Sequence, residues 1–139
     1  MLRGIWLIFL LVFSFSSMAC LKEGDKVALT GVMKKETVYG PPGWGESPKK
    51  DEKMDYWFFY PDKSLGCIAD MDDSVDHNDK KLQIIMSAKQ YNKYNMLLDE
   101  NIKLDGQIMF ANSPYHSTPL LIYHVSGIEL VKRVMKNES

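Results

Sequence analysis

The segment 102–110 (IKLDGQIMF) constrains the fold more than any other part of the chain. Apolar and polar residues alternate along it, which is the pattern of a strand with one buried face. The apolar positions are Ile102, Leu104 and Ile108. Gly106 falls on the apolar side, where a strand glycine indicates a bulge, a bend or close approach of another backbone. Residues 27–33 (VALTGVM) repeat the pattern with Gly31 at the same phase, so the two strands predict a small, strongly curved barrel.

Hydrophobic patterning and turn residues predict the other elements of the chain. We expect strands at residues 27–39, 55–60, 82–87, 102–110 and 119–131, with a short strand or extension at 65–69. A helix is expected over residues 88–98, because Ser87 is a good N-cap and apolar side chains recur on one helical face. These side chains are Tyr91, Tyr94, Leu97 and Leu98.

The order of these elements predicts the type of barrel. Strand, strand, strand, helix, strand, strand is the order of the OB-fold. The expected fold class is therefore mainly β: a small OB-like five-stranded Greek-key barrel with one helix between strands 3 and 4. Gly31 and Gly106 would be bend points of the first and fourth strands, neighbours that coil sharply to close the barrel. Another small β-barrel or roll with one helix is the alternative.

The first nineteen residues have the pattern of a secretory signal peptide. A short basic start containing Arg3 precedes the apolar run 4–15, and Ser17 and Ala19 are small residues at the positions read before cleavage. A membrane anchor is the alternative, but the apolar run is shorter than the roughly 20 residues that span a bilayer. We expect a cleaved signal at 1–19, a single OB-like domain at 20–134 and a frayed tail at 135–139.

The charge balance argues against a nucleic-acid partner. The chain carries 17 basic and 18 acidic side chains, and removal of Arg3 with the signal makes it slightly more acidic. A nucleic-acid interface needs a basic face or stripe, which this composition does not favour.

The two cysteines, Cys20 and Cys67, allow two interpretations. They pair in an oxidising compartment, as an even count in an exported chain favours. Alternatively, Cys20 is the lipid-modified first residue of a bacterial lipoprotein and Cys67 stays free, although the sequence before Cys20 lacks the leucine expected three residues upstream. The protein is accordingly expected to be exported and periplasmic, with an outer-membrane lipoprotein as the alternative. A membrane partner is expected only if Cys20 is lipidated.

Two features could form a binding surface. The loop 40–48 (GPPGWGESP) is stiffened by proline and carries an aromatic ring beside a carboxylate, although the same loop could be a rigid connection whose tryptophan packs over the barrel end. The strand 55–60 (DYWFFY) has aromatic residues on both faces, which would bind a sugar, a peptide or another apolar group if they were not core and cover. The candidate ligand-binding residues are Trp44, Glu46, Tyr56, Trp57, Tyr115 and His116.

Catalytic and metal-binding patterns are weak. Residues 70–79 contain five aspartates, whose oxygens suit Ca²⁺, but they lack the glycine and distal glutamate of an EF-hand, so a solvated acidic loop is the favoured interpretation. His116 and His124 could meet only if the intervening loop folds back. G-x-S-x-G and H-E-x-x-H motifs are absent from the sequence. We expect no enzymatic activity, no resident metal and no cofactor.

Several short stretches together resemble a known family pattern. They are Cys20-Leu21, VALTGVM (27–33), Glu36-Thr37, Gly40-Pro41-Pro42, Glu46-Ser47, Tyr56-Trp57, Cys67-Ile68, residues 91–98, LDGQI (104–108), His116 and Thr118-Pro119-Leu120-Leu121. On these residues the chain resembles a family of small exported bacterial proteins described only as a domain of unknown function. The resemblance implies the fold and compartment above and, because both cysteines belong to the pattern, the disulfide. Members often carry several histidines before the Thr-Pro, of which this chain keeps only His116, and this weakens a metal role.

These observations predict a non-enzymatic binding module of the bacterial envelope or periplasm. Its ligand would be an envelope protein, a glycan or a small molecule. One alternative is a protein-directed inhibitor or exclusion factor that acts on an enzyme or toxin, for which a projecting loop with Trp44 at its tip would be needed. A second alternative is a small hydrolase or metal-dependent enzyme, which would need a cleft that joins His116, His124 and an aspartate.

Overall fold

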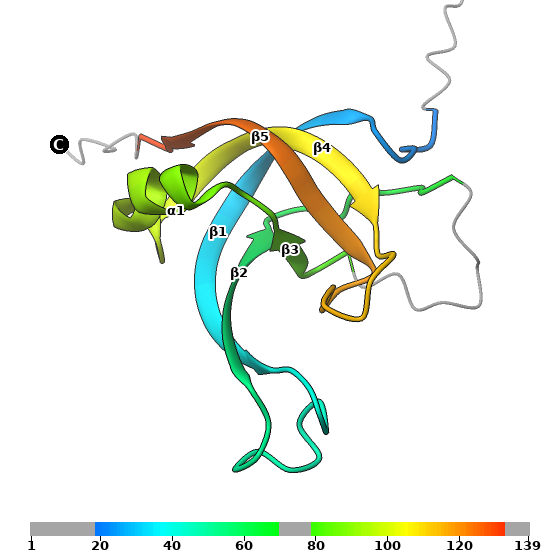
Figure 1. Cartoon of the computed structure of the whole chain (residues 1–139). Helices are drawn as coiled ribbons and strands as arrows, with labels where there is room; N and C mark the ends of the chain where they lie inside the picture. The colour runs from blue at the N-terminus through cyan, green and yellow to red at the C-terminus, as the bar shows by residue number, and fades with distance from the viewer. Residues whose placement is uncertain (1–18, 70–78, 133–139) are drawn as a thin grey trace, which may run out of the picture.

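The computed structural model describes residues 19–69 and 79–132 (Figure 1). The elements are β1 (Lys26–Tyr39), β2 (Lys53–Pro61), β3 (Leu82–Ile84), α1 (Ala88–Tyr94), the 3-10 turn η1 (Asn95–Leu97), β4 (Asn101–Phe110) and β5 (Leu120–Leu130). The prediction of a mainly β chain with one helix between its third and fourth strands is confirmed. Residues 1–18 of the predicted signal, the tail 135–139 and residues 70–78 of the acidic stretch lie outside the described residues. Within the described ranges, the chain has no helix long and apolar enough to cross a bilayer.

The five strands close in the hydrogen-bonded order β1-β2-β3-β5-β4, and β4 pairs back to β1. β1 is the longest strand and serves two neighbours. Its first half pairs antiparallel with β4 and its second half with β2, and Gly31 is paired on both sides, with Ile102 and with Pro61. The parallel pairing of β3 with β5 makes the sheet mixed. Figure 1 shows the strong curvature of β1 and β4 that this closure requires.

Both glycines singled out in the sequence lie where another chain segment approaches closely. A Cβ at Gly31 would collide with the carbonyl oxygen of Tyr60 and would lie 2.9 Å from the Cα of Pro61. A Cβ at Gly106 would lie 2.7 Å from Cγ2 of Ile122, beside an irregularity in the β4–β5 register. The predicted close approach is therefore confirmed at both positions, because only glycine leaves room for the neighbouring strand.

The core is formed by the inward faces of all five strands and by α1. It contains Met33, Trp57, Phe59, Leu82, Ile84, Tyr94, Ile102, Leu104, Ile108, Leu120, Ile122, Val125 and Ile128. β2 is unusual because its outward-facing Phe58 is also buried, with 1% of its surface exposed, although it lies outside this core cluster. A second, thinner layer therefore covers the outer face of β2.

Three local predictions need correction. The helix ends at Tyr94 and continues as η1, so the predicted span 88–98 was too long for an α-helix, although the predicted N-cap at Ser87 is confirmed with a full capping box to Gln90. Strand β3 stops at Ile84 because Ser87 already caps the helix. Residues 65–69 form no regular strand, so of the two predicted forms only the extension is left: Gly66 has φ of +78°, the Asp79 carboxylate accepts a hydrogen bond from the Leu65 amide, and Ile68 makes a single parallel β-bridge with Leu21.

The predicted disulfide between Cys20 and Cys67 is confirmed, with a Cα–Cα distance of 4.6 Å. Backbone hydrogen bonds run alongside it, from the Leu21 amide to the Cys67 carbonyl and from the Ala69 amide to the Leu21 carbonyl. The start of the described chain is thus fastened to the segment that follows β2. The lipoprotein alternative would need the same sulfur atom of Cys20.

We expect Gly31→Ala to destabilise the fold by about 2 kcal/mol or more, because the new methyl group overpacks the β1–β2 contact. Gly127→Ala is the matched control, since a Cβ there meets nothing within 4 Å. Urea unfolding followed by circular dichroism measures both variants. Equal stability of the two variants would contradict the role assigned to Gly31.

Replacing both cysteines, as Cys20→Ser with Cys67→Ser, should lower the free energy of unfolding by about 4 kcal/mol. The reason is that the cross-link spans a sequence separation of 47 residues and restricts the unfolded chain. Urea unfolding gives the change, and intact mass spectrometry before and after reduction tests for the bond in the wild-type chain. An unchanged midpoint, or a wild-type mass that reduction does not raise, would contradict the assignment.

Candidate functional site

Two loops far apart in the sequence meet on one side of the molecule. Residues 40–52 join β1 to β2, and residues 111–119 join β4 to β5. In Figure 1 the first loop extends below the sheet and turns back toward the second. The rings of Trp44 and Tyr115 meet at this junction with centroids 5.2 Å apart and planes at 67°. The sequence separation of the two residues gave no sign of this contact.

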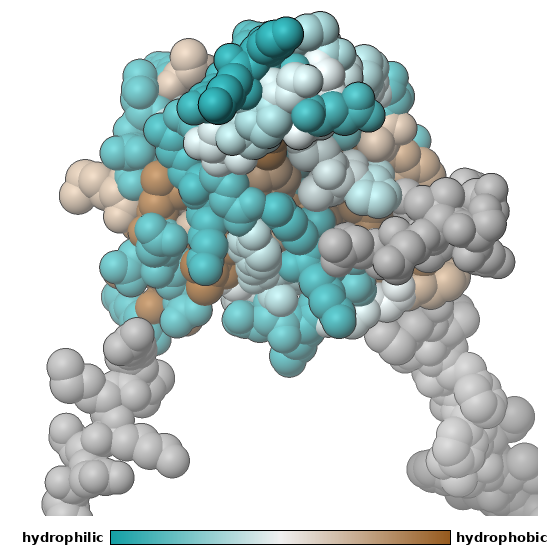
Figure 2. All heavy atoms as spheres, turned by 90° about the horizontal axis from the view of Figure 1, so that it is seen from below, coloured by the Kyte–Doolittle hydropathy of each residue, from teal (hydrophilic) through white to brown (hydrophobic). Residues whose placement is uncertain are grey.

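Both rings keep much of their surface open. Trp44 is 43% exposed and Tyr115 is 46% exposed. In an edge-to-face pair of this kind, the positive edge of one ring contacts the negative face of the other. The remaining surfaces of the two rings stay open to solvent. In Figure 2, which views the molecule from below, hydrophilic residues cover most of the surface and hydrophobic residues show between them. Both rings are therefore open to solvent on the loops that carry them.

The loop 40–52 is organised around the carboxylate of Asp51, which is only 7% exposed. It accepts hydrogen bonds from the backbone amides of Gly43 at 2.7 Å, Gly45 at 2.8 Å and Ser47 at 3.1 Å. A Cβ at Gly43 would lie 2.8 Å from the same carboxylate, so glycine is required there. Because these amides flank Trp44, whose φ is +52°, Asp51 fixes the backbone that presents the ring.

The hydrogen bonds also set the protonation of Asp51. Burial opposes the charged carboxylate and by itself would raise the pKa, but the amides of Gly45, Gly43 and Ser47 together hold the pKa of Asp51 below its ordinary value. Our sequence reasoning missed this residue. A usable signal existed, because a Gly-x-Gly-x-Ser turn leaves several amides without acceptors and the two acids Asp51 and Glu52 follow it within a lysine-rich stretch.

The loop 111–119 is fastened to the outer face of β3. The Thr118 hydroxyl accepts a hydrogen bond from the Gln83 amide and donates one to the Leu120 carbonyl, and the Ser117 amide donates to the Gln83 side-chain oxygen at 2.7 Å. Gln83 points away from the core yet is buried. These hydrogen bonds give the buried Gln83 side chain a partner. They also hold the base of the loop that carries Tyr115.

The outer face of β2 carries a ridge of three rings, Tyr56, Phe58 and Tyr60, at alternate positions. The Lys81 ammonium lies 4.2 Å from the centroid of Phe58 and forms a 2.6 Å ion pair with Glu36. The Tyr60 hydroxyl donates to the same carboxylate. The hydrogen bonds from Lys81 and Tyr60 hold the pKa of Glu36 below its ordinary value. The part of the ridge formed by Phe58 and Tyr60 is therefore occupied by the side chains of Lys81 and Glu36.

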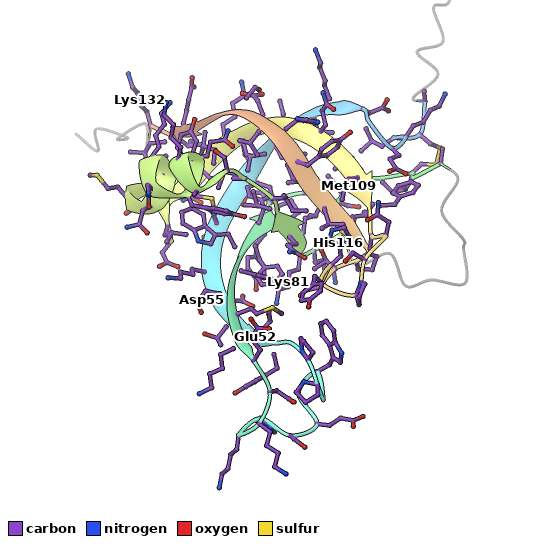
Figure 3. The ribbon with its side chains drawn as sticks, in the orientation of Figure 1. Glu52, Asp55, Lys81, Met109, His116 and Lys132 are labelled. Carbon is purple, nitrogen blue, oxygen red and sulfur yellow. A yellow bond between two sulfur atoms is a disulfide. The ribbon has the colours of Figure 1, made fainter. Side chains whose placement is uncertain are left out.

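The structure brings together part of the predicted ligand-binding set. Trp44 and Tyr115 touch, and Tyr56 is half-buried on the outer face of β2. Glu46 is exposed on the loop with Trp44. His116, labelled in Figure 3, is half-buried, and its Nδ1 accepts a hydrogen bond from the Asn112 amide at 3.1 Å, so it closes its own loop.

The assignment of Trp57 to a ligand-binding surface is wrong. Its side chain is 6% exposed and packs in the core against Tyr91, with ring centroids 5.1 Å apart. The reason is the alternation of β2: Trp57 and Phe59 point inward, whereas Tyr56 and Phe58 point outward. The sequence alone left the two faces of this aromatic strand interchangeable.

The two histidines considered as catalytic candidates, His116 and His124, lie in different surroundings. His116 forms its hydrogen bond within the loop 111–119. His124 is exposed on β5, its ring centroid lies 4.4 Å from that of Tyr123 with the planes tilted by 48°, and it lines a surface hollow with Asp105 and Ser126. Residues 19–69 and 79–132 hold no group of three or more histidine, cysteine or acidic side chains placed to bind a metal.

Comparison with known proteins finds one segment that is similar to a family. Residues 81–129 match the family described as Domain of unknown function (DUF4431). This confirms the resemblance to a domain of unknown function. The matched segment runs from the start of β3 through most of β5 and includes the loop with Tyr115, but not the loop with Trp44. No curated protein matches the chain, and no solved structure does.

We expect Asp51→Asn to loosen the loop 40–52, because the amide side chain cannot accept all three backbone hydrogen bonds. Trypsin should then cut at Lys49 and Lys50 about tenfold faster, because a loop that has lost these hydrogen bonds opens more often. Glu46→Gln, an exposed acid of the same loop, is the control.

Protonation of Asp51 in acid should loosen the wild-type loop in the same way. Since the folded pKa of Asp51 is lowered, its stabilisation is complete above the unfolded value and is lost as the pH falls through the folded one. Unchanged cleavage in Asp51→Asn would contradict this role.

Proposed function

We propose that this chain is an exported, non-enzymatic binding module whose ligand lies on the outer face of β2, between the loops 40–52 and 111–119. The observation that carries the proposal is the contact of Trp44 with Tyr115. These two aromatic side chains come from separate loops and contact each other, yet nearly half of the surface of each is exposed to solvent. Aromatic side chains on a rigid base give much contact area at a low cost in conformational entropy.

The arrangement of the strands supports an OB-like assignment and, with it, this location of the ligand. The closed order β1-β2-β3-β5-β4, with α1 between β3 and β4, is what an OB-like Greek-key barrel would have. In OB-folds the face of strands 2 and 3 and the loops after strands 1 and 4 bind oligonucleotides and oligosaccharides. Trp44 and Tyr115 belong to these two loops. The near-neutral charge argues against nucleic acid and leaves a glycan, a small molecule or an envelope protein.

Export to the periplasm is supported by the signal-like pattern of residues 1–19 and by the pairing of Cys20 with Cys67. Disulfides persist in oxidising compartments such as the periplasm. The absence of a nucleophile motif in the sequence and the separate surroundings of His116 and His124 speak for binding rather than hydrolysis.

An inhibitor that acts on an enzyme or toxin is the second candidate. The extension of the loop 40–52 beyond the sheet favours it (Figure 1). The packing of Trp44 against Tyr115 counts against it, because the ring leans on a neighbouring loop and is not a free tip. The binding module is therefore the function that we propose.

The proposal is tested by retention of envelope material on the immobilised mature protein. Periplasmic proteins, solubilised cell-wall glycan and a low-mass extract are applied separately to the wild type, Trp44→Ala, Tyr115→Ala and Met96→Ala. Met96 is the control because it is a large, exposed apolar residue on η1. We expect one fraction to be retained, and each aromatic substitution to reduce it about tenfold, as truncation of a binding anchor does.

The control variant should retain as much as the wild type. Equal retention by the wild type and both aromatic variants would overturn the proposed site, and retention by none of the proteins would overturn the proposed function.

A further inference from the structure

The aromatic ridge of β2 attracts cations. Two of its three outward rings already hold a lysine ammonium of this chain: Lys81 lies 4.2 Å from the centroid of Phe58, and Lys34 lies 5.5 Å from that of Tyr60. Such distances allow the negative face of the ring to attract the positive charge. The ridge therefore shows, within the molecule itself, which kind of group its rings accept.

The third ring, Tyr56, lies at the open end of the ridge. Its hydroxyl contacts the Met54 sulfur at 3.6 Å, and its ring centroid lies 6.4 Å from that of Phe58. Burial raises the pKa of Tyr56, and the electrostatic effects of Tyr115, Glu52 and Tyr91 raise it further. Figure 3 shows Glu52 at the point where β2 begins, below Lys81.

Glu52 and Met54 extend this neighbourhood to the base of the loop that carries Trp44. A Cβ at Gly40 would lie 3.0 Å from the terminal methyl of Met54 and 3.5 Å from a carboxylate oxygen of Glu52. The Gly40 carbonyl in turn accepts the hydrogen bond of the Trp44 amide at 3.0 Å. We call Trp44, Tyr115, Tyr56, Glu52 and Met54 the aromatic corner.

The aromatic corner offers groups that attract positive charge or accept hydrogen bonds. It offers the faces of aromatic rings, a thioether and a carboxylate, and the Glu52 side chain is exposed to solvent. Groups of this kind accept hydrogen bonds or attract positive charge. Aromatic cages that recognise ammonium groups combine the same elements.

We propose that the aromatic corner binds an organic cation, an ammonium or guanidinium group, held against Trp44 and Tyr115 and neutralised by Glu52. This inference rests on the proposed function and specifies its ligand. The same chemistry could be presented by a lysine or arginine side chain of a polypeptide or by a free or headgroup amine, and the probes below distinguish these sources.

The test uses matched pairs of probes that differ in charge but not in shape. Choline is compared with 3,3-dimethylbutan-1-ol, and N-acetyl-lysine amide with N-acetyl-norleucine amide. Binding to the mature protein is followed by NMR through the indole N–H signal of Trp44, which is assigned by its loss in Trp44→Ala. We expect at least one cation to shift this signal saturably, with a Kd about tenfold lower than that of its neutral partner.

Substitutions then locate the charge. Glu52→Gln should weaken binding of the cation about threefold or more, as for a partly exposed charge pair. Tyr115→Ala should abolish the difference between charged and neutral probes. Glu129→Gln, an exposed acid on β5, should change nothing. The amide spectrum of each variant shows that the fold is kept.

Equal binding of the charged and neutral members of both pairs, or a failure of both cations to shift the Trp44 signal, would overturn the cation inference. Neither result alone would overturn the binding module, which is decided by retention of envelope material on the wild type and its loss in Trp44→Ala. Preference for choline would assign the site to a headgroup or free amine, and preference for the lysine probe would assign it to a polypeptide side chain.

Discussion

The close approach of β1 to β2 at Gly31 is the contact on which the rest of the structure depends. The pairing of β1 with β4 and its pairing with β2 overlap at Gly31 and Val32, so one strand belongs to both sides of the closed sheet. The absence of a side chain lets the Tyr60 carbonyl and Pro61 lie against the β1 backbone. Because β1 bends here, its far end and the start of β2 extend beyond the sheet and carry the loop 40–52 toward the loop 111–119.

The two loops are fixed in different ways, and the difference matters for the site. One carboxylate, Asp51, gathers the amides of the loop 40–52, whereas the loop 111–119 is tied to β3 through Gln83 and Thr118. The backbone of each loop is therefore held by hydrogen bonds that do not depend on the contact between Trp44 and Tyr115. A site built in this way is pre-organised, so less conformational freedom is lost when a ligand binds.

The two faces of β2 differ in what covers them. Its inward residues, Trp57 and Phe59, fill the core, while Phe58 and Tyr60 are covered by Lys81, Glu36 and Lys34. No cation–π contact of this kind is recorded at Tyr56 among the described residues, and Tyr56 is the ring of the ridge that we include in the proposed aromatic corner.

The sequence by itself determined the periodic features of this protein. The alternation in β1 and β4, the glycines at 31 and 106, the cap at Ser87 and the order of the elements are local patterns, and local backbone physics makes them readable. The pairing of Cys20 with Cys67 followed from their even count and from the family resemblance. Only the tertiary structure decided which face of β2 points inward, that Asp51 is the centre of its loop, and that Trp44 meets Tyr115. These depend on contacts between residues distant in sequence, which no local period encodes, and they are the contacts that form the candidate site.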